Sequence, residues 1–407
     1  MRIHSLAGAL ALAASTAALL AASSAPAAAQ ARPADLETLP PVPTDYTPGK
    51  TAWGDWDFTG TWPIERLNEG RILFQRPSQY GNRFWVTDEE FQRRLEAARG
   101  NDGRFTNANE NGIGAAGTAG LEEWFSGTDF GHRTSMLVSP ADGQLPALTA
   151  RGQALYKEGR SGWVPGQHYD WVSDFDSWDR CVSRGFPASM YPFRYNNGIR
   201  VFQSPGYVTI VLEMLGTRVV KLYPDRAAAQ AAGWPGDVEA WMGNSRGWWE
   251  GKTLVIETTN IVSGDSAARD VARRSASPLN MATQHVPPYN TIPMSTDAMT
   301  VERLTMTGPD AIVHELTYTD PQVYTAPWTT RIEWTRDEDY QFFEYACHEG
   351  NYMPRDYISA SRAQREKEAR GEVEKVTVEN DDRSRFSGQF DWDPGVGPRP
   401  APPGAGG

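Results

Sequence analysis

Short runs of β-branched and aromatic residues dominate the second half of the chain. Each run is bounded by Gly, Pro, Asn or Asp, which is typical of strands that end in turns. Links such as Gly308-Pro309-Asp310 are too short for parallel pairing, so the runs predict an antiparallel meander. The predicted strands cover residues 207–215, 217–223, 253–259, 300–307, 311–319, 329–335 and 341–347.

Helical signals are few and predict only short peripheral helices. Thr87 and Glu90 form a capping box ahead of apolar residues at helical spacing. Two further helices are predicted over residues 149–158 and 359–373. Near the start of the fold, Gly60-Thr61-Trp62 is similar to the opening of the first strand in lipocalin-type barrels, where the Trp plugs one end. We therefore predict a mainly β fold whose meander closes into a lipocalin-like barrel or cup.

Alternation along the strands assigns side chains to faces. His314 shares a face with Ile312, Leu316 and Tyr318, so it is either a core residue, the favoured interpretation, or one that points into a cavity. Glu213 and Glu257 stand among apolar residues. We favour a solvated position for both over a carboxylate that points into the barrel.

The two ends of the chain predict the compartment and the domain limits. Residues 1–29 combine Arg2, an apolar run and small residues at the end, which predicts a cleavable signal peptide and a periplasmic or secreted protein. No membrane span is expected in the mature chain. A leader rich in Pro and Ala follows over 30–52, then one β-rich domain or two sub-barrels over 53–390, and a disordered Pro/Gly tail over 391–407.

Charge and motif content exclude several classes of function. The formal net charge is −12 without a cluster of Lys and Arg, which argues against binding nucleic acid or an anionic membrane surface. No metal site and no cofactor are predicted, because the chain lacks Cys-x-x-Cys and its histidines lack metal-binding spacing. These histidines, outside the signal peptide, are His132, His168, His285, His314 and His348.

Cys181 and Cys347 are the only cysteines. In an oxidising compartment an even pair most simply forms a disulfide. The alternatives are two free buried thiols, or a catalytic Cys347 beside His348.

Two loops that follow predicted strands carry candidate catalytic residues. Asp320 comes directly after the strand that contains His314, and its loop also carries Tyr324 and Trp328. His348 and Glu349 follow the last predicted strand and form the most plausible reactive pair, although a structural turn beside a disulfide explains them equally well. Loops at the end of a rigid sheet commonly hold ligands.

Two further segments carry candidate ligand-binding residues. In the predicted loop 237–250, Trp241 and Trp249 flank Arg246, which could pair with a ligand carboxylate or phosphate, or tie two loops together. Tyr195, followed by Asn196 and Asn197, forms another polar and aromatic patch.

Several long motifs together resemble a family of secreted bacterial β-rich proteins that is largely uncharacterised. The resemblance covers roughly residues 55–360 and implies kinship without a reaction. In that family Asp usually stands where this chain has Asn244, which argues against an acidic role there. The motifs are FTGTW, DRCVSRGFP, RYNN, WMGNSRGWWEGKTLVIETTN, VERLT, YTDPQVYTAPW and EYACHEGNY.

The leading hypothesis is an exported protein that binds, and could transform, a small and partly apolar organic molecule in the barrel. Catalysis would be cofactor-free acid–base chemistry of lyase, isomerase or hydratase type, with His348 or His314 as base and Asp320 or Glu349 as partner. The ligand-binding candidates are Trp241, Arg246, Trp249, Tyr324, Trp328 and Tyr195.

Two alternatives come from other classes. Trp-rich loops and paired carboxylates could serve a carbohydrate-active or carbohydrate-binding protein. A purely structural role in the cell envelope would need neither a pocket nor such a cleft. The sequence predicts no oligomeric state.

Overall fold

The computed structural model describes residues 32–64, 72–108, 128–157, 166, 168–175, 177–192, 196–262 and 294–377. The predicted signal peptide, the predicted tail and Tyr195 lie outside these ranges. The predicted leader falls within them from residue 32 onward and runs without a helix or a named strand.

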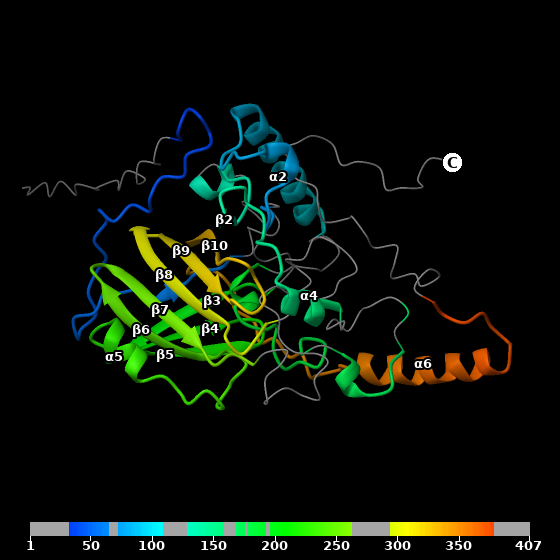
Figure 1. Ribbon diagram of the computed structural model, residues 1–407. Helices are drawn as coiled ribbons and strands as arrows, with labels where there is room; N and C mark the ends of the chain where they lie inside the picture. The colour runs from blue at the N-terminus through cyan, green and yellow to red at the C-terminus, as the bar shows by residue number, and fades with distance from the viewer. Residues whose placement is uncertain are drawn as a thin grey trace, which may run out of the picture.

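One curled sheet of ten strands forms a half-barrel, or cup, which confirms the mainly β prediction (Figure 1). The strand order is β1-β3-β4-β5-β6-β7-β8-β9-β10-β2. The strands are β1 (Gly60–Thr61), β2 (Leu137–Ser139), β3 (Ile199–Ser204), β4 (Tyr207–Leu212), β5 (Gly216–Leu222), β6 (Asn244–Glu250), β7 (Thr253–Thr259), β8 (Met299–Gly308), β9 (Ala311–Thr319) and β10 (Trp328–Thr335).

The predicted antiparallel meander is confirmed from β6 to β10, and β3, β4 and β5 also pair antiparallel. One junction differs, because β6 runs parallel to β5 and the chain crosses between them through α5 (Arg226–Ala231). The prediction of a loop over 237–250 was wrong for β6. Since α5 covers its outer face, β6 is buried on both faces and lacks the polar–apolar alternation that marks a half-buried strand.

The prediction of a strand over 341–347 was also wrong. This segment follows β10 without ladder hydrogen bonds and contacts the ends of β3 and β4 instead. The backbone N–H of Phe343 donates to the Glu213 carboxylate at 2.9 Å, and the Arg200 guanidinium lies 4.7 Å from the Phe342 ring centre. The backbone of residues 341–347 is therefore held by the Glu213 side chain and by the disulfide at Cys347.

The helices lie around the cup. The predicted capping box is confirmed: the Thr87 N–H donates to Glu90, and the Glu90 N–H donates to the Thr87 hydroxyl. α6 starts earlier than predicted, has no buried residue, and stands away from the body in Figure 1. The longer helices are α2 (Asp88–Ala108), α4 (Ala150–Lys157) and α6 (Met353–Ala369), and the 3₁₀ helices are η1 (Ser78–Tyr80), η3 (Asp129–His132), η4 (Val172–Asp174) and η5 (Ala188–Met190).

The main hydrophobic core fills the concave side of the sheet. Trp62, which follows β1, is fully buried, and the Arg336 guanidinium lies 4.3 Å from the centre of its ring. The Asp337 N–H donates to the Thr61 carbonyl, so the chain leaving β10 meets the chain leaving β1 at this end of the cup.

The predicted disulfide between Cys181 and Cys347 is present, with the Cα atoms 5.6 Å apart. It joins the segment before η5 to the segment before α6. The Asn351 side-chain amide donates to the Cys181 sulfur at 3.2 Å, so the same junction also carries a hydrogen bond.

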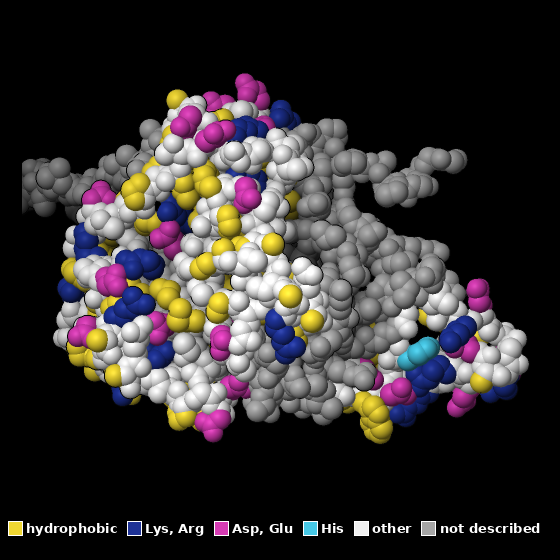
Figure 2. Space-filling view, viewed as in Figure 1, with side chains coloured by type: hydrophobic (Ala, Val, Ile, Leu, Met, Phe, Trp, Pro, Cys, Tyr) yellow, Lys and Arg dark blue, Asp and Glu magenta, His cyan; other side chains and the backbone are white. Residues whose placement is uncertain are grey.

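The surface is of mixed charge on the face shown in Figure 2, where Lys and Arg side chains are interspersed with Asp and Glu. Among the described residues, no helix combines the length and the apolar character needed to cross a membrane.

Candidate functional site

Three strands place a chain of charged side chains inside the cup. Arg218 on β5 donates to both carboxylate oxygens of Glu302 on β8, at 3.1 and 2.5 Å, and Glu302 contacts the His314 Nε2 on β9 at 2.9 Å. The side chains of Glu302, His314 and Arg218 are all 0% exposed. Arg218 also donates to the hydroxyls of Ser245 and Thr258. We call these five residues the inner network.

The inner network keeps Glu302 ionised. Burial alone raises the pKa of a carboxyl group, but the Arg218 charge and the His314 hydrogen bond outweigh it and lower the pKa of Glu302 to about 2. A buried ion pair contributes little net stability compared with an apolar core of the same shape, because both ions lose their hydration. Such a network is therefore a candidate for function as well as for fold specificity.

Residues 184–191 lie across the inner network and fill the mouth of the cup. The Phe186 ring centre lies 4.3 Å from the Arg218 guanidinium carbon, and the Met190 sulfur lies 3.4 Å from Arg218 Nη1. The Tyr191 hydroxyl is 3.1 Å from the Thr330 hydroxyl on β10. The cup is thus occupied by its own chain, and we call residues 184–191 the plug segment.

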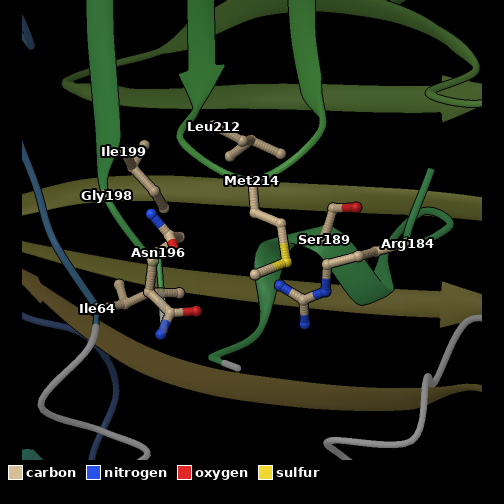
Figure 3. Close-up of a pocket in the computed structure, with 9 residues that line it drawn as sticks. Ile64, Arg184, Ser189, Asn196, Gly198, Ile199, Leu212 and Met214 are labelled. Carbon is tan, nitrogen blue, oxygen red and sulfur yellow. The ribbon is translucent and has the colours of Figure 1, made fainter. Parts of the chain in front are cut away.

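A pocket lies between the plug segment and the start of β3 (Figure 3). The space between the lining residues is about 210 Å³ when the part open to solvent is included, and the enclosed volume is about 10 Å³. Arg184 and Ser189 approach it from the plug segment, Asn196 lies opposite, and Met214 reaches in between them. The full lining is Ile64, Arg184, Ser189, Asn196, Asn197, Gly198, Ile199, Leu212 and Met214.

Glu213 fixes the wall of this pocket. Its carboxylate accepts from the Gly198 N–H at 2.9 Å, from the Asn196 amide at 3.1 Å and from the Tyr340 hydroxyl at 2.6 Å. A Cβ at Gly198 would lie 2.8 Å from that carboxylate, so the close approach requires glycine. The prediction that Glu213 is solvated was wrong, because the carboxylate binds the chain that follows β10.

His348 and Glu349 belong neither to the inner network nor to the lining of the pocket. Both side chains are exposed, in a turn that follows the disulfide. His314 is the only one of the four predicted catalytic residues that belongs to the inner network. Its partner there is Glu302, whose role the sequence did not indicate.

Asp320 lies in a separate buried cluster. Its carboxylate accepts from the Ser295 N–H and hydroxyl, at 2.8 and 2.6 Å, and from the Tyr318 hydroxyl at 3.1 Å. Burial and the nearby Asp320 charge raise the pKa of Tyr318 well above its ordinary value, so the phenol stays protonated and donates. Asp320 thereby anchors the loop after β9.

The predicted aromatic ligand-binding residues pack into the core. Trp328 stacks on Tyr318 with ring centres 4.9 Å apart, and Tyr324 meets Trp328 edge-on at 6.3 Å. Trp249 contacts Phe58 at 5.4 Å. Trp241 is partly buried against the same core. None of these four side chains lines the pocket in Figure 3.

Arg246 ties α5 to the sheet from the outside of the cup. It pairs with Glu257 at 3.2 Å and donates to the Ala229 carbonyl on α5 at 3.3 Å. These contacts link α5 to β6 and β7. The prediction that Glu257 is solvated was wrong, because α5 covers this face and Arg246 supplies the opposite charge.

Sequence reasoning missed Arg184, Ser189 and Met214 as lining residues. Arg184 stands within the DRCVSRGFP motif and Asn196 within RYNN, so the convergence of two motifs was the available signal. Within the described ranges, no group of three or more His, Cys, Asp or Glu side chains is arranged to hold a metal ion.

Comparisons of the chain with protein-family models, curated proteins and solved structures found no match.

Proposed function

We propose that this protein is exported and binds a small, partly apolar organic molecule in the pocket between the plug segment and β3. The observation that carries the proposal is the composition of the lining. Ile199, Leu212 and Met214 form an apolar wall, whereas Arg184 and Asn196 bring polar groups to the same space. Pockets for small organic ligands combine an apolar lining with a few placed polar groups.

The size of the pocket limits the ligand. Its enclosed volume is about 10 Å³, which is room for about one water molecule, so a ligand has to move the plug segment away from β3 in order to bind. We therefore propose a compact ligand with one polar end and a short apolar body, because a small molecule requires the smallest such movement. The buried lining residues exclude water from that body, which favours binding through the hydrophobic effect.

Export is supported by the disulfide. Such bonds persist mainly in oxidising compartments, including the bacterial periplasm and the exterior of the cell. The Cys181–Cys347 bond is consistent with the signal peptide predicted over residues 1–29.

The carbohydrate alternative gains no specific support. Among the buried carboxylates of the described residues, those of Glu213, Glu257, Glu302 and Asp320 each accept hydrogen bonds within their own cluster, and Asp174 accepts from the backbone N–H groups of Asp170 and Trp171. These clusters hold strands and loops together, whereas a glycosidic site needs two carboxylates that flank a substrate.

A thermal-shift screen of small organic molecules tests binding at this pocket. Met214→Phe fills the pocket from its apolar wall, and Val219→Phe is the control because Val219 is exposed on the outer face of β5. We expect compounds that stabilise the wild type and Val219→Phe but not Met214→Phe, each compared with its own ligand-free Tm. Equal shifts in all three proteins would place binding elsewhere.

A further inference from the structure

The chain between β10 and α6 lies against one wall of the pocket, and we call residues 340–347 the strap. The Tyr340 hydroxyl donates to Glu213 at 2.6 Å. A Cβ on Gly198, which lines the pocket, would lie 2.6 Å from the Tyr340 ring and 2.9 Å from the Phe342 ring. The strap therefore packs two aromatic rings directly against the pocket wall.

The disulfide joins the strap to the opposite wall. Cys347 is the last residue of the strap, and Cys181 comes shortly before Arg184, which begins the plug segment and lines the pocket. The strap belongs to no strand, so the contacts with Glu213 and the covalent bond hold its two ends. The bond thus ties the two walls of the pocket together.

Cys181 is held in a conformation that its side chain disfavours. Its φ is 59°, in the left-handed region that few residues other than glycine adopt. Such residues persist only where the surrounding structure imposes the conformation, and they cluster at switch regions. Breaking the bond removes one of the constraints on Cys181. Cys347 is partly exposed, so a reductant has access to the bond.

We propose that the Cys181–Cys347 bond is a redox-sensitive lock on the pocket, opened by a dithiol reductant. The inference rests on the proposed binding function and adds its regulation. With the bond intact, the strap and the plug segment stay together and leave an enclosed volume of about 10 Å³. Once the bond is broken, the strap moves off Gly198 and the start of β3 separates from the plug segment. The apparent affinity for a ligand scales with the fraction of open molecules, so reduction raises it.

The lock opens by thiol–disulfide exchange. A thiolate of the dithiol attacks the Cys347 sulfur, and the electron pair of the S–S bond leaves on the Cys181 sulfur. The second thiol of the reductant then attacks the reductant's own sulfur in the mixed disulfide and releases Cys347. The dithiol loses two electrons and becomes a disulfide. The protein gains those electrons and two protons as a pair of cysteine thiols.

Oxidation of methionine by hydrogen peroxide tests this opening on the natural sequence. Met214 lines the pocket and is 2% exposed (Figure 3), Met306 lies in the core and is 4% exposed, and Met299 at the start of β8 is partly exposed. One sample keeps the disulfide. The other is reduced with dithiothreitol, capped with iodoacetamide and freed of both reagents. Peptide mass spectrometry then gives the rate of sulfoxide formation at each methionine.

We expect Met214 to oxidise about tenfold faster in the reduced and capped protein, with the rates at Met306 and Met299 unchanged. Equal rates at Met214 in the two samples would overturn the lock. A parallel increase at Met306 would also overturn it, because the whole core would then be loosened. The Cys181→Ser/Cys347→Ser variant carries no capping groups and should repeat the result. Faster oxidation of Met214 in the capped protein alone would count against the inference.

The panel of small organic molecules screened by thermal shift separates the lock from the binding function. We expect panel compounds to raise the Tm of the reduced and capped protein more than that of the disulfide-bonded protein, each compared with its own ligand-free Tm. Compounds that shift both forms equally would overturn the lock and leave the binding function standing. The absence of a shift in either form would overturn both.

Discussion

Replacing Glu302 by Gln should destabilise the fold strongly, because the change leaves the Arg218 charge buried without its counter-ion. The Arg218 and Glu302 side chains are 0% exposed and share two hydrogen bonds. Removing one partner of such a buried pair costs about 3–5 kcal/mol of the free energy of unfolding. Arg218→Met should cost a similar amount, because the Glu302 carboxylate then lacks its main donor.

The double variant Arg218→Met/Glu302→Gln should cost clearly less than the sum of the two single changes. With both charges removed, neither is left uncompensated in the core, and replacing a whole buried pair can be close to neutral. The difference between the sum and the double variant measures their coupling.

Urea unfolding followed by Trp fluorescence gives these free energies, provided that the slope of the transition stays constant among the variants. Arg303 and Glu250 form the matched control, because they also pair across the sheet, at 2.7 Å, but are 42% and 45% exposed. Arg303→Met and Glu250→Gln should each cost no more than about 1 kcal/mol. Single changes at Arg218 and Glu302 that cost as little as the control pair would show that the buried pair contributes no more to stability than the exposed one.

Three further predictions test other parts of the structure. Replacing Cys181 and Cys347 by Ser opens a cross-link between residues 166 apart and should cost about 5 kcal/mol in urea unfolding, whereas a loss below about 1 kcal/mol would contradict it. Glu213→Gln should weaken the contact with the Tyr340 hydroxyl, so hydrogen–deuterium exchange should speed up in residues 340–343, and unchanged exchange would argue against it. Burial is the largest cause, and the Arg32 charge the second, that lowers the pKa of His132 from 6.5 to about 4. The folded protein therefore holds the neutral ring, which contributes about 1–2 kcal/mol to the free energy of unfolding. This contribution is complete above pH 6.5 and is lost as the pH falls towards 4. His132→Gln should flatten that part of the pH–stability curve, and an unchanged curve would exclude His132 as its cause.

Much of the sheet follows from local pattern. The bounds of β7 and β9 match the predicted strands, and alternation placed His314, Leu316 and Tyr318 on the buried face. The turn residues also indicated that β8 pairs with β9, because only Pro309 and Asp310 separate Gly308 from Ala311. Strands that face solvent on one side carry this period in their sequence.

The partners of the buried charges could not be predicted in the same way. His314 and Glu302 are brought together by the pairing of β8 with β9, whereas Asp320, closer in sequence, lies in a different cluster. Glu213 and Glu257 were expected in solvent, because no local signal showed which segments cover them. The chain that follows β10 covers Glu213, and α5 covers Glu257.

The pocket depends on contacts between segments that are distant in sequence. Arg184 and Met214 meet only because the plug segment enters the cup and the disulfide holds the chain beside it. The loop with His348 was instead predicted as a catalytic site, because all of its polar and aromatic residues stand in one stretch of sequence.

Native mass spectrometry of the wild type and Met214→Phe, purified from an export compartment, tests the binding site most directly. Denaturing each sample afterwards releases bound molecules for identification. We predict that the wild type retains a small organic compound with a polar end and an apolar body, and that Met214→Phe lacks it. An empty wild-type protein, or the same compound on Met214→Phe, would contradict the assignment of the pocket between the plug segment and β3 as the binding site.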